Sequence, residues 1–344
     1  MSDLKYLGAY ITPALFFAGL YFLGWMTWAT VIFAYVLVPL IDHLGHASSE
    51  NLSADSKQSK LSNRFFDILL YLNLPLVYLG VGASIYVFTT TSLIGFEIVG
   101  IIFSLGFVLG AMGINVGHEL GHRNNKIEQH FSKLLYLPSH YIHFFIEHNR
   151  GHHKHVSTPH DPATARKGQS LYQFWLQSVL GGYRSAWRIE NQRLKADDQN
   201  IWSWHNQMIR FTIYQLAYWV LIFSVASPII AGYIMVAGVI SFLLLETINY
   251  IEHYGLRRKL LPSGRYERVQ SHHSWNANYP IGRILLYELT RHSDHHFIAS
   301  KKYQVLDHHD EAPMLPYGYP ASMMASMIPP LWYSIMDKRV PQVV

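Results

Sequence analysis

The sequence predicts an all-α integral membrane protein, with six transmembrane helices in three hairpins that carry a cytoplasmic helical cap. Composition is the first observation behind this prediction. Half of the 344 residues are hydrophobic and 14% are charged, whereas roughly a quarter of the residues in soluble domains are charged. The second observation is a series of long apolar segments, and the third is the placement of the basic residues around them.

Six apolar segments are expected to cross the bilayer, because most of them approach the roughly 20 residues that a helical span requires. Very short turns, "LGW", "TTTS" and "ASP", join them in pairs and predict helical hairpins. No basic leader with a small-residue cleavage site precedes the first segment, so we expect that segment to remain in the mature protein. The predicted spans are 7–23, 25–41, 65–89, 93–116, 208–225 and 228–248.

The basic residues predict the orientation. The 27 Lys and Arg residues lie at the amino terminus, in the long connections, beside helix ends or in the tail, and none lies in the joining turns. Because Lys and Arg collect on the cytoplasmic side of a membrane, both termini and all long segments are predicted to be cytoplasmic. Residues 1–344 then form a single domain at a bacterial inner membrane, with a cap made of residues 118–206 and 250–344.

The chain contains no cysteine. This excludes disulfides, a thiolate nucleophile and an iron centre bound by four cysteines. Any metal must therefore be bound through nitrogen and oxygen. Histidine is abundant instead: of 21 histidines, all but His43 and His46 lie after residue 117, on the predicted cytoplasmic side.

Four histidine clusters have spacings that suit metal binding. "GHELGHR" places two histidines four residues apart, on one face of a helix. "EHNRGHH" repeats this spacing with His148 and His152 and adds His153, which an α-helix turns about a quarter circle away. "RHSDHH" predicts three rings on one side of a helix, and "NYIEHYG" adds one ring after the sixth span. The nine candidate ligands are His118, His122, His148, His152, His153, His253, His292, His295 and His296.

Nine imidazoles exceed the needs of one ion, since a single metal is satisfied by about four to six ligands. One site with nine therefore implies two ions with open positions, and imidazole suits iron, copper, zinc and nickel. Carboxylates among the clusters can compensate the metal charge by accepting ring N–H bonds. The remaining histidines, His205 and His309 among them, are expected to be structural or exposed. The candidate carboxylates are Glu119, Glu147, Asp161, Glu252 and Asp294.

These motifs resemble the histidine boxes of the integral-membrane diiron hydroxylases, and specifically those of the alkane 1-monooxygenase family. The boxes are HELGH, EHNRGHH with the following VSTPHDPATAR, NYIEHYGL and LTRHSDHH. The segments GRYERVQSHHSWNAN, DEAPMLPYGY and PPLW are also similar to the carboxyl-terminal half of that family. The resemblance therefore covers most of the chain from Asn115 onward.

The resemblance implies terminal hydroxylation of medium-chain n-alkanes to 1-alkanols, with O₂ as co-substrate. Two iron ions (Fe²⁺/Fe³⁺) would be held by the nine histidines, with no catalytic residue beyond the metal ligands. An unactivated C–H bond offers no acidic proton, so its cleavage requires a redox cofactor rather than acid–base chemistry. The two electrons are implied to come from rubredoxin and its NAD(P)H-dependent reductase.

A basic segment after the sixth span is the candidate docking site for this electron donor. The segment closely follows His253 and contains Arg257, Arg258 and Lys259. Together with the net charge of +5 on the whole chain, these residues would steer an acidic partner. Basic residues at this face also serve topology and the binding of anionic lipid.

The alkane, which partitions into lipid, is expected to enter between the helices. Bulky side chains in the first two spans could limit how far its tail extends. The candidate stops are Phe16, Phe17, Trp25, Trp28 and Phe33.

Three alternatives stay open. A related membrane diiron hydroxylase would act on alkyl-aromatic methyl groups. An intramembrane zinc protease would use HELGH with Glu119 as base, but it leaves seven box histidines without a role. A metal transporter would normally place its ligands at mid-membrane depth rather than at helix ends. No motif indicates a nucleic-acid partner, and the sequence leaves the oligomeric state open, with a homo-oligomer among the options.

Overall fold

The computed structural model describes residues 3–341 and is helical, with no β-strand in that range and two isolated β-bridges. The helices up to residue 136 are η1 (Asp3–Tyr10), α1 (Ile11–Phe22), η2 (Gly24–Trp28), α2 (Ala29–Ile32), η3 (Phe33–Leu37), α3 (Val38–Leu44), α4 (Ala54–Ser62), α5 (Phe65–Tyr71), α6 (Asn73–Thr90), α7 (Gly95–Val108), η4 (Leu109–Ile114), α8 (Asn115–Gly121) and α9 (Lys126–Tyr136). The remaining helices are α10 (Phe144–Glu147), η5 (His148–His152), α11 (His153–His155), α12 (Leu171–Ala196), α13 (Gln207–Val225), α14 (Pro228–His253), η6 (Ser271–His273), α15 (Pro280–Leu285), α16 (His292–Phe297), η7 (Tyr303–Val305), α17 (Tyr319–Ser326) and α18 (Pro329–Met336).

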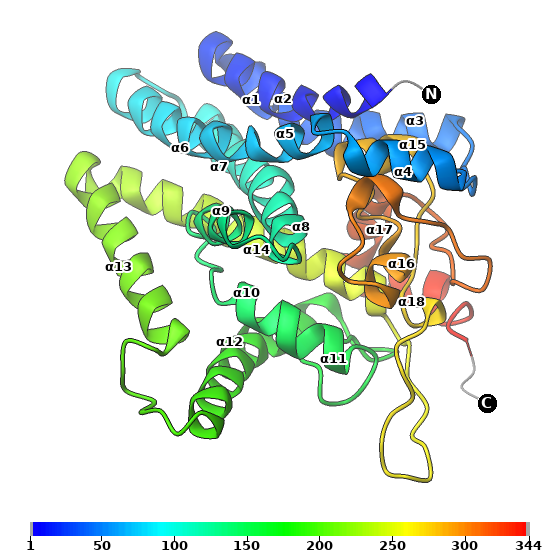
Figure 1. Cartoon of the computed structure of the whole chain (residues 1–344). Coiled ribbons are helices and arrows are strands. Elements are labelled where there is room, and N and C mark those ends of the chain that lie inside the picture. Colours follow the sequence, from blue (N-terminus) through cyan, green and yellow to red (C-terminus); the bar gives the residue numbers. More distant parts are fainter. Residues whose placement is uncertain (1–2, 342–344) are drawn as a thin grey trace.

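The long apolar helices extend to one side of the molecule, and the short helices of the carboxyl-terminal region gather at the other (Figure 1). Within residues 3–341, five helical stretches are long and apolar enough to cross a membrane, and they correspond to the last five predicted spans. These stretches are Gly24–Leu44, Phe65–Thr90, Gly95–Gly121, Gln207–Val225 and Pro228–His253.

The first predicted span, residues 7–23, is divided between the 3-10 helix η1 and the α-helix α1. With 12 residues, α1 is about 18 Å long at 1.5 Å per residue. The hydrocarbon core of a bilayer is about 30 Å thick. Six spans in three hairpins therefore remain a prediction, and five spans are supported by helix length and composition.

Local sequence signals fix the ends of α14, the helix that presents His253. At its start, the Ser227 side chain accepts a hydrogen bond from the backbone N–H of Ile230, and Pro228 occupies the first turn. After its end, Gly255 adopts a φ of 73°, which glycine tolerates because it has no Cβ. The chain turns away there and leaves His253 as the last residue of a long helix.

Close packing brings α14 against α7 and η4. A Cβ atom placed on Gly106 would lie only 2.7 Å from Cγ2 of Ile240 and 3.0 Å from the carbonyl oxygen of Ala237. The absence of a side chain at Gly106 thus permits the two helix backbones to approach. Because η4 continues into α8, this contact sets the two histidine-bearing helix ends beside one another.

Three π-helical turns interrupt the longer helices: η3, η4 and η5. A π turn closes its hydrogen bonds between residues i and i+5 rather than i and i+4, and such turns are frequent at functional sites. The turn η5 carries two of the predicted ligands, so it changes which side chains share a helix face.

Candidate metal centre

The structure brings all nine predicted histidines together in two adjoining groups. In each group one nitrogen from every member lies within 4.8 Å of the others. The groups touch, since the ring centroids of His153 and His296 are 4.3 Å apart. The five-histidine group is His118, His122, His148, His153 and His295, and the four-histidine group is His152, His253, His292 and His296.

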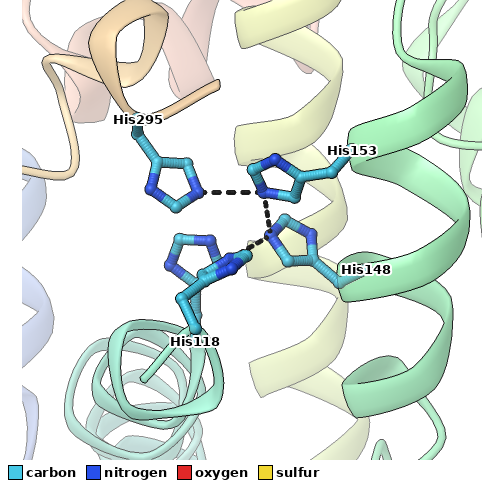
Figure 2. A group of neighbouring side chains, drawn as sticks. His118, His148, His153 and His295 are labelled. Atoms are coloured by element: carbon cyan, nitrogen blue, oxygen red, sulfur yellow. Dashed lines mark hydrogen bonds between the residues drawn. The ribbon is translucent and has the colours of Figure 1, made fainter. Parts of the chain in front are cut away.

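The labelled rings of His118, His148, His153 and His295 point toward one another from α8, η5–α11 and α16 (Figure 2). Nε2 of His148 lies 3.0 Å from Nε2 of His122 and 3.0 Å from Nε2 of His153. Nε2 of His153 lies a further 3.1 Å from Nε2 of His295. Four Nε2 atoms from three separate segments therefore point at a common region.

The expected pairing of His148 with His152 is wrong. His148 belongs to the five-histidine group and His152 to the four-histidine group. The reason is the π turn η5 between them, in which residue i+5 rather than i+4 returns to the same face. His153, expected a quarter circle away, is thus the partner of His148.

The three rings of "RHSDHH" also divide between the groups. His292 and His296, one helical turn apart, join the four-histidine group, whereas His295 joins the five-histidine group. The ring centroids of the three histidines are 4.4–5.5 Å apart, so neighbouring side chains of the short helix α16 supply both groups. The three rings therefore lie together as predicted, although they divide between the two groups.

The donor set fits metal cations. Nε2 of His152 and Nε2 of His296 are buried and have no hydrogen-bond partner in residues 3–341. Burying such polar atoms without partners costs free energy. Lone pairs that face one another, as those of His148 and His153 do, are stabilised by a cation between them, and imidazole nitrogens suit iron, copper, zinc and nickel.

Electrostatics keep these rings neutral. Burial lowers the pKa of His122, His148, His153 and His295 well below the usual value, and neighbouring imidazoles lower it further. The pKa of His296 is depressed in the same way. Only neutral imidazole can bind a metal, so the site is prepared for ligation.

Asp161 makes the contact predicted for a supporting carboxylate. Its Oδ2 lies 2.9 Å from Nδ1 of His152, and the Thr164 hydroxyl donates to the same oxygen at 2.5 Å. Burial alone would raise the pKa of Asp161, but His152 and Thr164 hold it below its usual value. A carboxylate on the outer nitrogen orients the ring and leaves Nε2 for a metal.

Glu119 and Asp294 make other contacts, and Oε1 of Glu147 is buried with no hydrogen-bond partner in residues 3–341. Glu119 accepts hydrogen bonds from Arg123 at 3.0 and 2.8 Å, so it is not available as the general base of an HExxH protease. Burial, and then the carboxylates of Asp161 and Glu246, raise the pKa of Glu147 well above its usual range.

Asp294 pairs with Lys301 at 2.6 Å and with Nε2 of His309 at 2.8 Å. His309, expected to be structural or exposed, therefore supports the turn that carries His295 and His296. The sequence gives no sign of this contact, because 15 residues separate the two side chains.

Glu252 lies directly before His253 and is buried. Its Oε2 is 3.1 Å from Nε2 of His292, and its Oε1 accepts a hydrogen bond of 2.7 Å from the Tyr319 hydroxyl. Sequence reasoning assigned no role to Tyr319, which is the last residue of the motif DEAPMLPYGY and begins α17.

An apolar cavity of about 70 Å³ runs from the spans to the histidines. Side chains of η3, α14 and α17 form its walls, and at one end it is bordered by His118, His148 and His292. Of the five candidate stops, only Phe33 lines it. Phe16 is buried in the core among other helices, and Trp25 is 76% exposed.

A second, polar cavity of about 800 Å³ opens in the cap, and we call it the cap basin. Basic side chains of Arg166, Arg188, Arg257 and Arg258 line it, and Asp161 forms part of its wall. Because Asp161 contacts Nδ1 of His152, only this one side chain separates the basin from the histidine.

The three candidate docking residues differ in their surroundings. Arg257 is exposed and lines the cap basin. Arg258 is half-buried, and its guanidinium donates to the carbonyl oxygens of Glu267 at 2.7 Å and Lys154 at 2.9 Å. The exposed Lys259 donates its backbone N–H to Glu267 at 2.8 Å. Arg258 therefore holds the loop together, and Arg257 and Lys259 remain as candidates for docking.

Comparison with known proteins identifies the family. The fatty acid desaturase family model matches residues 95–324. Alkane 1-monooxygenase 1 of Alcanivorax borkumensis is 37% identical over 333 residues, which cover 95% of this chain and 82% of the relative. The alkane 1-monooxygenase of Pseudomonas putida is 36% identical, covering 92% and 79%.

The chain belongs to the alkane 1-monooxygenase family. The resemblance seen in the histidine boxes is thereby confirmed, and with its apolar helices the chain is a membrane monooxygenase. The hydroxylase component of the xylene/toluene monooxygenase of Pseudomonas putida is also similar, at 27% identity over 98% of this chain and 89% of the relative. The chain is thus similar both to the fatty acid desaturase family and to a xylene/toluene hydroxylase component.

Proposed function

We propose that the protein hydroxylates the terminal carbon of medium-chain n-alkanes. The overall reaction consumes the alkane, one O₂, two electrons and two protons, and yields the 1-alkanol and water. Two iron ions would be bound by the five-histidine and four-histidine groups, one in each. When bound, the iron would supply the O₂ activation that an unactivated C–H bond requires.

The apolar cavity is the observation that carries this proposal. A hydrocarbon offers no group for hydrogen bonding, so a site for it must recognise it by apolar contact and shape. Phe33, Leu244 and Ile248 supply such contact along the cavity, and His118 and His292 border its end. An alkane lying in the cavity would present one end to the histidines and keep the rest of its chain among the spans.

The walls of the cavity also exclude water. Phe107, Leu245 and Met323 line it beside the histidines, and Leu245 and Met323 are buried. An enclosed apolar site protects a reactive centre from side reactions with solvent. The chain itself thus binds the substrate, orients its terminal carbon and keeps the reaction dry.

Electrons would enter from the cap basin. We propose rubredoxin, reduced by its NAD(P)H-dependent reductase, as the electron donor. Arg257 and Lys259 would contact acidic residues on the surface of rubredoxin. The basin wall includes Asp161, which hydrogen-bonds to His152. A donor seated at the basin would therefore be separated from a ligand of the four-histidine group by a single side chain.

The proposed setting is the bacterial inner membrane, with the cap and both termini in the cytoplasm. Lys and Arg are absent from the short turns that join the predicted spans, and this distribution supports the orientation. A cytoplasmic cap would also place the basin where reduced rubredoxin is available.

Metal analysis and a substrate panel together test the proposal. Purified protein should contain two irons per chain and, with rubredoxin and its reductase, convert octane to 1-octanol. Faster oxidation of xylene methyl groups than of any n-alkane would instead favour the function named for the xylene/toluene relative. A single bound zinc without oxygenase activity would refute both.

A further inference from the structure

Glu252 occupies an unusual place at the edge of the four-histidine group. It is 1% exposed, and its Oε2 lies 3.1 Å from Nε2 of His292. That same nitrogen lies 3.2 Å from Nε2 of His253. A carboxylate oxygen and two ring nitrogens thus converge, and Glu252 faces the apolar cavity as well.

The contact between Glu252 and His292 has two chemical explanations. In the first, a proton lies between the two atoms, donated either by Nε2 of His292 to the carboxylate or by a neutral Glu252 carboxyl group to Nε2, and either hydrogen bond removes His292 as a ligand. In the second, the proton is on Nδ1, and the Nε2 lone pair and the carboxylate oxygen both face a cation. Only the second explains why His253 also directs its Nε2 to this point, because one proton cannot serve both contacts well.

We infer that the Glu252 carboxylate is an anionic ligand of the metal ion held by the four-histidine group. The inference rests on the proposed metal site and adds an oxygen donor to it. With Glu252 the four-histidine group reaches five donors, the number that the other group already has. Carboxylate and imidazole together are a ligand combination that suits iron.

Charge compensation points the same way. Within residues 3–341, no Lys or Arg forms an ion pair with Glu252, whereas Glu119, beside the five-histidine group, pairs with Arg123 at 2.8 Å. A buried carboxylate without a countercharge is costly, and a divalent cation would supply one. The Tyr319 hydroxyl fixes Oε1 at 2.7 Å and so orients Oε2 toward His292.

The test compares Glu252→Ala, Glu252→Gln and, as a matched control, Glu246→Gln. Glu246 is also buried on α14, but its Oε1 accepts a hydrogen bond from the Tyr141 hydroxyl at 2.8 Å. Metal-free protein would be titrated with Co²⁺ by calorimetry, and protein loaded with ⁵⁷Fe would be studied by Mössbauer spectroscopy. Neither measurement depends on turnover.

We expect wild type and Glu246→Gln to bind two ions with the same two Mössbauer signatures. In Glu252→Ala the ion of the four-histidine group should bind at least about tenfold more weakly, and added formate should restore the affinity for that ion. Glu252→Gln keeps the side-chain volume and should change the signature of one iron only. Wild-type affinity and signatures in Glu252→Gln would overturn the inference, whereas failure of the wild type itself to bind two ions would overturn the proposed function.

Discussion

The Nε2 atoms of His148 and His153 lie 3.0 Å apart although five residues separate them in the chain. The π turn η5 makes this possible, since it adds one residue to the turn between them. The same turn directs His152 to the other group. One short segment therefore supplies ligands to both groups, and its backbone geometry determines which histidine serves which group.

Gly151 lies inside this π turn and should be intolerant of a side chain. A Cβ there would lie 2.7 Å from Oε1 of Glu147 and 3.0 Å from Cδ1 of Ile189. We expect Gly151→Ala to destabilise the protein by about 1–3 kcal/mol through overpacking and to reduce its bound iron. Gly232→Ala on α14 is the control, because a Cβ there meets nothing within 4 Å. Equal thermal unfolding and equal iron content in the two variants would contradict this role for η5.

Replacing a candidate ligand should remove activity together with metal. For His295→Ala we predict a loss of turnover of at least about 100-fold and a lower iron content, measured by alkane oxidation and elemental analysis. His205→Ala is a suitable control because His205 is exposed and outside both groups. His309, which sequence reasoning would offer as a control, is unsuitable because it hydrogen-bonds to Asp294. Full activity in His295→Ala would remove it from the proposed ligand set.

Much of the site could be predicted from the sequence, because the spacing of histidines within a short segment determines which of them share a helix face. The spacing of His118 and His122 on a helix was sufficient to place them in one group. The division of His148, His152 and His153 was not predictable, because a π turn leaves the i and i+4 spacing in the sequence unchanged. Its position depends on packing around the turn, such as that of Gly151 against Ile189.

Contacts over long separations were also out of reach. Tyr319 reaches Glu252 across 67 residues, and the cavity combines walls from η3, α14 and α17. Hydropathy predicted six spans, and within residues 3–341 the structure supports five of them by helix length and composition. It could not show that Asp3–Tyr10 form a 3-10 helix, so that α1 begins only at Ile11 and has 12 residues.

The metal-free protein should lose stability as the pH falls. Burial lowers the pKa of His122, His148, His153, His292, His295 and His296 well below 6.5 in the folded state. Above pH 6.5 these rings are neutral in both states and contribute no pH dependence. Below about 6.5 the unfolded chain takes up protons that the folded chain does not, so the free energy of unfolding decreases with falling pH.

Thermal unfolding of the metal-free protein in detergent between pH 8 and pH 5 measures this effect. The variant His295→Ala has one depressed histidine fewer and should show a shallower decline. A decline that is equally steep in both proteins would show that other groups are responsible.

Narrowing the apolar cavity should shift the preferred alkane toward shorter chains. Ala34 is buried on η3 and lines the cavity with Phe33. The larger side chain in Ala34→Leu would occupy space in the cavity among the spans. Ala34 lies on η3, which carries none of the histidine ligands. Each substrate methylene group that no longer fits in the cavity should change the discrimination between long and short alkanes by about 1–3 kcal/mol. The ratio of long-chain to short-chain turnover should therefore fall at least about tenfold. An unchanged ratio, with iron content intact, would mean that the substrate lies elsewhere.

Electron delivery should be intermolecular and sensitive to salt. The chain has no cysteine for a rubredoxin-type centre of its own. The exposed Arg257 lines the cap basin, and the exposed Lys259 follows it two positions later in the chain. Charges at an exposed rim act mainly on the association rate, and their effect is screened over about 8–10 Å at physiological salt. The double variant Arg257→Gln/Lys259→Gln should therefore need more rubredoxin for half-maximal activity and show a flatter dependence on salt, with iron content unchanged.

The double variant leaves Arg258 in place, because its guanidinium holds the loop through the carbonyl oxygens of Glu267 and Lys154. A matched control is Lys126→Gln/Lys195→Gln, which removes the same charge from exposed positions that do not line the basin. If donor docking depends on the local field at the basin, the control should retain the wild-type salt dependence. If the two double variants weaken donor binding equally, the effect comes from net charge and the basin is not the docking site. A wild-type rate that is indifferent to salt with an acidic soluble donor would remove electrostatic docking altogether.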